Sequence, residues 1–168
     1  MYCRPDLPTS LRLASRLAQT LAYLHAAHII HRNLCPSNVL VSVDKGLLNL
    51  LELRMAGAEA RQTDAENHPV AGDWAYFSPE QTGRMNRPVD YRTDLYSLGM
   101  LLYRMLAGQL PFQGKDPLEW AHCHAARLPP PLRDIAPAVP QSVADIVMRL
   151  LAKLPEDQIG RASCRERV

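Results

Sequence analysis

The first part of the chain carries apolar residues at the spacing of an amphipathic helix. Pro8-Thr9-Ser10 is a typical helix start. From there apolar side chains recur every three or four residues, at Leu11, Ala14, Leu17, Ala18, Leu21 and Leu24. The pattern predicts one helix that ends at about His28. Ile29-Ile30 follows it as a short apolar step.

Three further helices are predicted downstream. Thr93 to Ala107 is strongly apolar, which predicts a long buried helix with core residues Leu95, Leu98, Leu101 and Leu102. Asp116 to Arg127 is the next candidate. The prolines of Leu128-Pro129-Pro130-Pro131 end it, because proline has no amide hydrogen and clashes with the preceding turn. The last helix is amphipathic, with apolar residues at Val143, Ile146, Val147, Leu150 and Leu151.

Between the first two helices the pattern changes. Val39-Leu40-Val41 and Leu47 to Leu51 are short apolar runs on either side of Asp44-Lys45-Gly46, which predicts a small β-ribbon with a tight turn. Met55 to Ala75 is polar and rich in alanine, glycine and acidic residues, so a long loop is expected there. The fold class predicted from these patterns is mainly α with one small ribbon.

Composition restricts the classes of function. The 168 residues are 47% hydrophobic, which favours a globular class over a disordered one. The formal net charge of +2, without a Lys/Arg block, is too small to indicate nucleic acid or an anionic membrane as partner. No apolar stretch approaches the roughly 20 residues of a membrane helix. The four cysteines form no C-x-x-C pair and no apolar leader precedes them, so free thiols in a cytoplasmic protein are expected.

Three motifs stand in a fixed order. His31-Arg32-Asn33-Leu34-Cys35-Pro36-Ser37-Asn38 has the spacing of H-R-D-L-x-x-x-N, the catalytic loop of protein kinases. Ser78-Pro79-Glu80 resembles the A-P-E element that closes an activation segment. Asp94-Leu95-Tyr96-Ser97-Leu98-Gly99 resembles the start of the buried helix that follows it. With the ribbon between them, the motifs make the chain resemble the C-terminal lobe of a Ser/Thr protein kinase, with the N-lobe absent.

A narrower resemblance covers Tyr76 to Arg87, Asp90 to Asp94, Asp116 to Glu119 and His122-Cys123-His124. These segments resemble the kinase-like domain of large bacterial proteins that combine a Ser/Thr kinase, an ATPase region and a sensor histidine kinase. The resemblance implies a signalling context with ATP and Mg²⁺ as cofactors. It also implies that the downstream ATPase and histidine-kinase regions of a parent protein are the partners.

The catalytic positions depart from the family pattern. Phosphoryl transfer uses a catalytic-loop aspartate to accept the proton of the substrate hydroxyl. Asn33 stands at that position, and a neutral amide cannot take the proton. Cys35 stands where many Ser/Thr kinases carry a lysine near the transferred phosphate. Both positions are therefore degenerate by resemblance.

The positions expected to bind Mg²⁺ also depart from the family pattern. Glu52-Leu53-Arg54 aligns with the D-F-G motif, so Glu52 keeps the charge but adds a methylene that displaces the carboxylate. Arg54 replaces glycine and removes backbone freedom. Asn38, the second magnesium ligand by resemblance, is retained, so Asn38 and Glu52 are the expected ligands if nucleotide binds. His122-Cys123-His124 is not expected to hold a metal, because adjacent helical residues do not share a face.

The remaining motif residues have structural roles by resemblance. His31 packs under the catalytic loop, with Leu53 at the position of the D-F-G phenylalanine. Arg32 pairs with a phosphorylated loop in active kinases, whereas solvent or a glutamate is its expected partner here. Glu80 closes the activation segment. Asp94 accepts backbone N–H groups of the catalytic loop. Capping of its own helix is the simpler interpretation, and the two roles can coexist.

Three divisions of the chain are expected. Residues 1–10 form a truncated edge on the hinge side, residues 11–157 the kinase-like lobe, and residues 158–168 a tail. Ile159 to Val168 resembles a translated sequencing adapter, with Gln158 at the junction, and a genuine divergent tail is the alternative. No Gly-rich loop, strand lysine or partner glutamate of a kinase N-lobe is recognisable in the 168 residues.

The hypothesis favoured by the sequence is a catalytically inactive, pseudokinase-type regulatory or interaction module. Two alternatives stay open. One is a truncated active Ser/Thr protein kinase that transfers the γ-phosphate of ATP to protein serine or threonine and uses Glu52 for the metal. The other is a decayed gene fragment without function.

Overall fold

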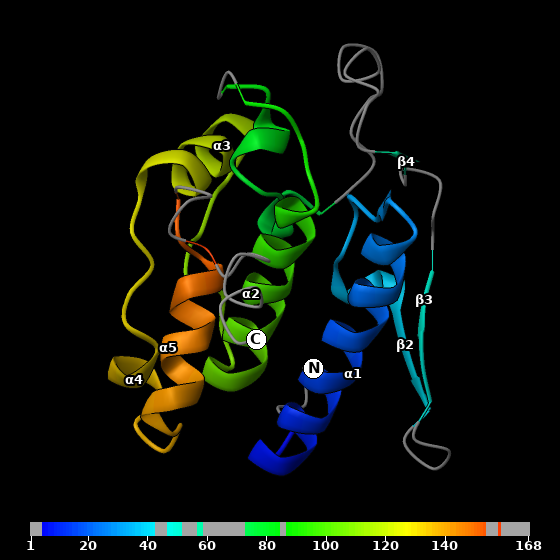
Figure 1. The fold of residues 1–168 in the computed structure, drawn as a ribbon. Coiled ribbons are helices and arrows are strands. Elements are labelled where there is room, and N and C mark those ends of the chain that lie inside the picture. The colour runs from blue at the N-terminus through cyan, green and yellow to red at the C-terminus, as the bar shows by residue number, and fades with distance from the viewer. Residues whose placement is uncertain are drawn as a thin grey trace, which may run out of the picture.

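The computed structural model describes residues 5–42, 47–51, 57–58, 73–84, 87–153 and 158 (Figure 1). Most of the regular structure is helical: α1 (Leu7–Ala26), α2 (Arg92–Ala107), α3 (Pro117–Ala126), α4 (Leu132–Ile135) and α5 (Gln141–Leu150). The strands are short: β1 (Ile29–Ile30), β2 (Val39–Ser42), β3 (Leu47–Leu50) and β4 (Gly57–Ala58). Three 3₁₀ turns lie at Pro36–Asn38, Trp74–Tyr76 and Glu80–Thr82. The mainly α fold class with a small ribbon is confirmed.

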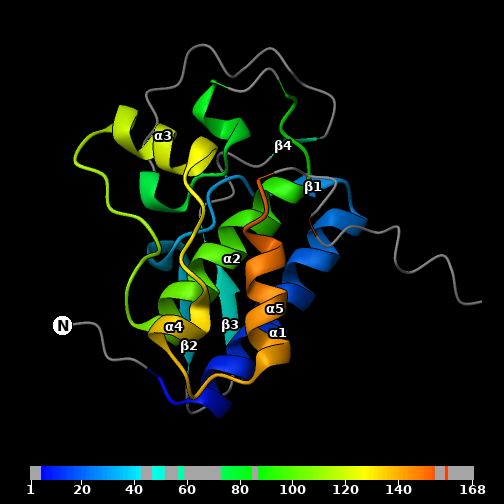
Figure 2. The same cartoon turned by 90° about the vertical axis from the view of Figure 1, so that its left-hand side faces the viewer.

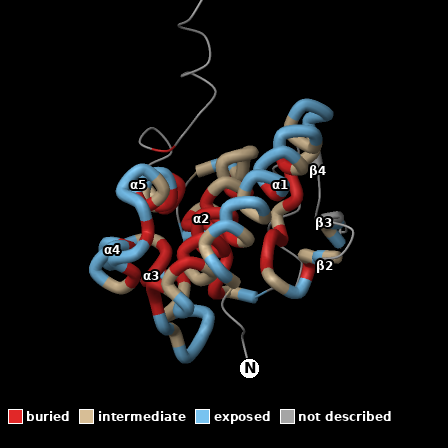
Figure 3. Tube along the Cα trace, turned by 90° about the horizontal axis from the view of Figure 1, so that it is seen from below, coloured by how far each residue is buried: buried red, intermediate tan, exposed pale blue. Residues whose placement is uncertain are grey.

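Helix α2 is the centre of the lobe. It lies between α1 and α5, and the ribbon of β2 and β3 flanks α1 on the side away from α5 (Figures 1 and 2). Helix α3 packs against the Trp74–Tyr76 turn, and α4 packs against α5. Seen from below, α2 is largely buried, while the outer faces of α1 and α4 are exposed (Figure 3). The hydrophobic core therefore surrounds α2.

Helix α1 begins at a local capping signal and ends earlier than predicted. The carboxylate of Asp6 accepts a hydrogen bond from the Thr9 amide at 3.3 Å, and Pro8 sits in the first turn, where its missing N–H costs nothing. Leu17 and Leu21 are buried against the core. The helix ends at Ala26 instead of about His28, because His28 adopts a φ of 57° that a right-handed helix cannot contain.

Helix α2 follows the predicted range closely. Leu98, Leu101 and Leu102 are buried as predicted. Leu95 is only partly buried although its neighbours Asp94 and Tyr96 are fully buried, so it lies on the less covered side of the first turn. Gly108 ends the helix with a φ of 79° and donates its amide to the Arg104 carbonyl at 2.8 Å. Glycine adopts this left-handed conformation without steric cost.

The predicted ribbon is present. β2 and β3 pair antiparallel from Val39 opposite Leu50 to Ser42 opposite Leu47, and the intervening turn lies outside the described residues. The expected loop from Met55 to Ala75 was partly wrong. β4 lies within it and pairs antiparallel with β1, and the Trp74–Tyr76 turn begins before its end. Helix α4, after the prolines, was also missed. Elements of two to four residues are too short to show a period in the sequence.

Several sequence expectations fall on residues that the structure does not describe. Glu52-Leu53-Arg54 and the tail from residue 159 to 168 are among them. Gln158 is described: it is buried, its Nε2 donates to the Ala152 carbonyl at 3.0 Å, and its Oε1 has no hydrogen-bond partner among the described residues. Within the described ranges, no helix combines the length and apolar character needed to cross a bilayer.

Candidate functional site

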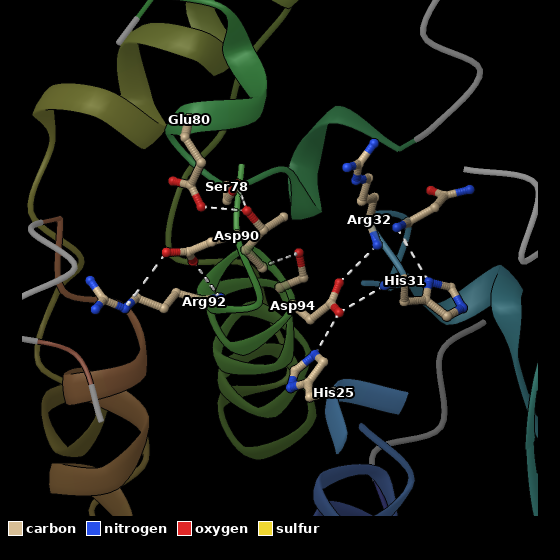
Figure 4. A network of polar contacts seen from close by, with 11 residues as sticks. His25, His31, Arg32, Ser78, Glu80, Asp90, Arg92 and Asp94 are labelled. Carbon is tan, nitrogen blue, oxygen red and sulfur yellow. Dashed lines mark hydrogen bonds and ion pairs between the residues drawn. The ribbon is translucent and has the colours of Figure 1, made fainter. Parts of the chain in front are cut away.

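The catalytic-loop motif is held in place by the carboxylate of Asp94 from the first turn of α2 (Figure 4). Asp94 is 0% exposed, and it accepts the backbone N–H of His31 at 2.9 Å and that of Arg32 at 2.8 Å. The ring Nε2 of His25, near the end of α1, lies 2.8 Å from the same carboxylate. Hydrogen bonds to a charged acceptor are stronger than neutral ones. One side chain therefore joins α1, α2 and the loop.

These are the loop contacts that the resemblance implies for Asp94. The simpler alternative, a cap of its own helix, is not seen. Helix α2 begins at Arg92 with Tyr91 at the cap position, and the carboxylate that accepts the Arg92 amide, at 2.8 Å, belongs to Asp90 and not to Asp94.

His31 ties the loop to the ribbon. Its ring is fully buried, and Nδ1 accepts the backbone N–H of Asn33 at 3.3 Å. The proton of the neutral ring is therefore on Nε2, which donates to the Leu51 carbonyl at 3.1 Å. This arrangement is structural, because both ring nitrogens are occupied. The expected neighbour Leu53 lies outside the described residues.

Arg32 has an unusual backbone and an unpaired buried nitrogen. Its φ is 62°, in the left-handed region that residues other than glycine rarely adopt. The side chain points away from Asp94 (Figure 4), and its Nε is buried with no hydrogen-bond partner in the part of the chain that the structure describes. The expected glutamate partner is not found among the described residues.

Asn33, which was expected at the catalytic-base position by resemblance, is only 5% exposed and lies among neutral groups. The thiol of Cys35 is 3.9 Å from its Oδ1 and 3.0 Å from the Ser37 hydroxyl. Asn38 closes the loop: its Nδ2 donates to the Asn33 carbonyl at 2.9 Å. The structure thus brings Asn33, Cys35 and Asn38 together, and no carboxylate of the described residues hydrogen-bonds to them.

The described residues fit a nucleotide-bound Mg²⁺ only in part. The Oδ1 of Asn38 makes no hydrogen bond within the described ranges, so it is available as a neutral oxygen ligand. Asp94 cannot serve, because its two oxygens already accept from three groups inside the protein. Mg²⁺ at phosphate sites is commonly bound through carboxylates as well. A charged ligand would have to come from Glu52, which the structure does not describe.

A second set of buried and partly buried polar groups joins the Ser-Pro-Glu segment to α2 and the loop. The hydroxyl of Thr93 donates to the Glu80 carboxylate at 2.6 Å. The Oε1 of Gln81 accepts a hydrogen bond from the Ser78 backbone N–H at 3.0 Å, and its Nε2 donates one to the Arg32 carbonyl at 2.6 Å. Sequence reasoning named Ser78 only as part of the Ser-Pro-Glu motif and gave Gln81 no role of its own. The sequence signal for Gln81 was its position directly after the Ser-Pro-Glu motif.

A chain of hydrogen bonds also crosses the core under α3. Lys153 donates to the Tyr96 hydroxyl at 3.0 Å, the hydroxyl lies 3.0 Å from Nδ1 of His124, and Nε2 of His124 donates to the Trp74 carbonyl at 2.9 Å. Burial lowers the pKa of His124 to about 4 and that of Lys153 to about 8. His124 is therefore neutral at pH 7, and the Tyr96 hydroxyl donates to it.

This role of His124 was not anticipated from the His122-Cys123-His124 motif. Cys123 is also buried, and its thiol lies 3.8 Å from the Gln113 carbonyl, whereas His122 is exposed. No group of three or more histidine, cysteine, aspartate or glutamate side chains in the described part of the chain is arranged to hold a metal ion.

Comparison with known proteins gives the family. Residues 9–167 match the protein kinase domain. The match includes the catalytic loop, the Ser-Pro-Glu segment and the helix that carries Asp94. The chain therefore belongs to the protein kinase domain family.

Two bacterial relatives cover most of the chain. It is 35% identical over 153 residues to a probable serine/threonine-protein kinase of Clostridium perfringens, covering 91% of this chain and 22% of that protein. It is 40% identical over 151 residues to the serine/threonine-protein kinase pkn2 of Myxococcus xanthus, covering 86% and 18%. The chain thus spans about a fifth of the length of these kinases.

A third relative is named as a histidine kinase. The hybrid signal transduction histidine kinase G of Dictyostelium discoideum is 47% identical over 87 residues, which is 52% of this chain and 2% of that protein.

Proposed function

We propose that this kinase-family lobe works as a pseudokinase-type regulatory or interaction module in a larger signalling protein. The observation that carries the proposal is Asn33. It occupies the catalytic-base position on a loop whose backbone is held by Asp94, His31 and Asn38, so no shift of the loop is expected to bring another base into its place. General acid–base help is typically worth 10²–10⁴-fold in rate.

Two further features support inactivity. Cys35 replaces the lysine near the transferred phosphate and is buried against neutral groups. Electrostatic stabilisation of the phosphates is often the largest contribution to catalysis. The available oxygen of Asn38 is uncharged, so the described residues contribute little to this stabilisation. Weak or absent binding of ATP and Mg²⁺ by this chain follows.

The second candidate is an active Ser/Thr protein kinase. The two bacterial relatives are named as serine/threonine-protein kinases, and the loop keeps Asn38 in place with its Oδ1 available. In this alternative Glu52 binds the metal and an N-lobe in the parent protein covers the nucleotide.

The proposed partners are ATPase and histidine-kinase regions of the parent protein. The similarity to a hybrid histidine kinase supports this context. The tail from residue 159 to 168 is proposed to contribute nothing to the module, whereas Gln158 at the junction is buried and hydrogen-bonded to Ala152.

A radiolabelled-ATP assay tests the proposal. The purified 168-residue chain is incubated with Mg²⁺ or Mn²⁺ and a generic protein substrate, beside a no-protein control and an active bacterial Ser/Thr kinase. We expect no phosphate transfer above the no-protein control, and no gain from Asn33→Asp in this chain. Transfer above that control by the unmodified chain would overturn the pseudokinase proposal.

A longer form of the native protein separates the two candidates. If it carries a Gly-rich loop and a strand lysine, we expect nucleotide binding to return first. Phosphotransfer is then expected only with Asn33→Asp and Arg54→Gly together. Transfer by the longer native protein without substitutions would favour the active kinase.

A further inference from the structure

Arg32 immediately precedes the degenerate base position, and its backbone is in a costly conformation. A left-handed φ costs a residue with a Cβ roughly 1–2 kcal/mol and persists only where neighbouring contacts hold it. Both backbone polar groups of Arg32 have such contacts. Its N–H donates to Asp94 at 2.8 Å, and its carbonyl accepts from Gln81 Nε2 at 2.6 Å.

The orientation of the Gln81 amide is fixed from both ends. The Arg32 carbonyl can only accept, so the nitrogen of the amide must face it. The Ser78 backbone N–H can only donate, so the amide oxygen must face that group, at 3.0 Å. The Ser78 hydroxyl adds a second hydrogen bond to the same oxygen at 3.2 Å. Glutamate lacks the donor and asparagine is shorter by one methylene, so glutamine alone satisfies both ends.

The contact acts directly on Asn33. The Arg32 carbonyl and the Asn33 N–H belong to one planar peptide unit. Gln81 holds the oxygen of that unit, and His31 Nδ1 accepts its N–H at 3.3 Å. The plane fixes the N–Cα bond of Asn33, and the hydrogen bond from Asn38 Nδ2 to the Asn33 carbonyl at 2.9 Å restricts rotation about that bond. Together they restrict the direction in which the Asn33 side chain leaves the backbone.

We propose that Gln81 is a positioning residue that couples the Ser-Pro-Glu segment to the catalytic loop by holding the Arg32–Asn33 peptide plane. Its partner in the loop is 49 residues away in sequence. A displacement of the Ser78 to Gln81 segment is therefore transmitted to the side chain at the catalytic position. The geometry carries this inference. Only the importance of Asn33 rests on the proposed function.

Site-resolved amide hydrogen exchange on the full 168-residue chain tests the coupling. Gln81→Glu keeps the size and the acceptor facing Ser78 but cannot donate to Arg32. We expect the Arg32 and Asn33 amides to exchange about tenfold faster, the effect of losing one net hydrogen bond, while amides in the middle of α2 stay within about twofold. Gln19→Glu is the matched control, since Gln19 is exposed on α1. It should leave all these rates unchanged.

Two more variants make the test specific. Gln81→Met lacks donor and acceptor and should accelerate the same two amides. Ser78→Ala removes only the hydroxyl and should leave them near the wild-type rates. The proposal is overturned if Gln81→Glu leaves Arg32 and Asn33 unchanged, if it accelerates all amides alike, or if both Gln81 variants lose cooperative folding. Exchange is measured without nucleotide, so failure of the proposed function in the ATP assay would not alter this result.

Discussion

Gly99, in the middle of α2, faces the C-terminal end of α5 at close range. A Cβ added at this position would lie 2.9 Å from the Cβ of Leu150 and 3.0 Å from Cδ2 of Leu151. Leu150 Cβ is bonded to the backbone of α5, so it cannot rotate away. Gly99→Ala therefore forces the two helices apart, and we expect it to destabilise the fold.

Two opposing contributions set the size of the effect. Alanine is favoured over glycine within a helix by about 1 kcal/mol. Overpacking a close contact costs about 1–3 kcal/mol, and this contact falls at the severe end because the backbone of a neighbouring helix must move. The expected net loss is about 1–2 kcal/mol in the free energy of unfolding, or about 2–8 °C in Tm for a domain of this size.

Urea and thermal unfolding followed by circular dichroism measure the loss. Ser15→Ala, at an exposed position of α1, is the control for helix propensity and should leave stability unchanged or slightly higher. Leu151→Ala removes one of the two clashing side chains, so the double variant should lose about 1 kcal/mol less than the sum of the single variants. A Gly99→Ala protein as stable as the wild type would refute the close packing of α2 on α5.

Two further predictions concern buried polar groups. The pKa of His124 is 6.5 when unfolded and about 4 when folded, so the unfolded state binds more protons between these values, and stability should fall by about 3 kcal/mol as the pH drops from 6.5 to 4. Urea titrations across this range should lose that slope in His124→Gln but keep it in His122→Gln, and a slope retained in His124→Gln would contradict the assignment. Asp94→Asn should cost about 3 kcal/mol, because one amide oxygen cannot accept from three donors and its NH₂ group faces one of them. Asp134→Asn, at an exposed site, is the control. If it lowers the free energy of unfolding as much as Asp94→Asn does, the loop contacts of Asp94 do not account for the loss.

The sequence alone was sufficient for the long elements and for the family. Helices α1, α2, α3 and α5 each span ten or more residues, so a 3.6-residue period or a sustained apolar run is visible before any contact is known. The ribbon of β2 and β3 was predictable because its two apolar runs flank a turn sequence. The catalytic-loop motif is contiguous, which made Asn33, Cys35 and Asn38 identifiable by position.

Tertiary structure decided the features whose partners are distant in sequence. β1 pairs with β4 although each strand has two residues, because pairing and not periodicity creates such strands. Asp94 reaches His31 across 63 residues, and Gln81 reaches Arg32 across 49. His124 meets Trp74 across 50 residues, which turns a residue of an unremarkable motif into part of a buried chain of hydrogen bonds. A polar side chain carries no signal of its own for such a contact, because only the folded backbone brings its donor or acceptor within range.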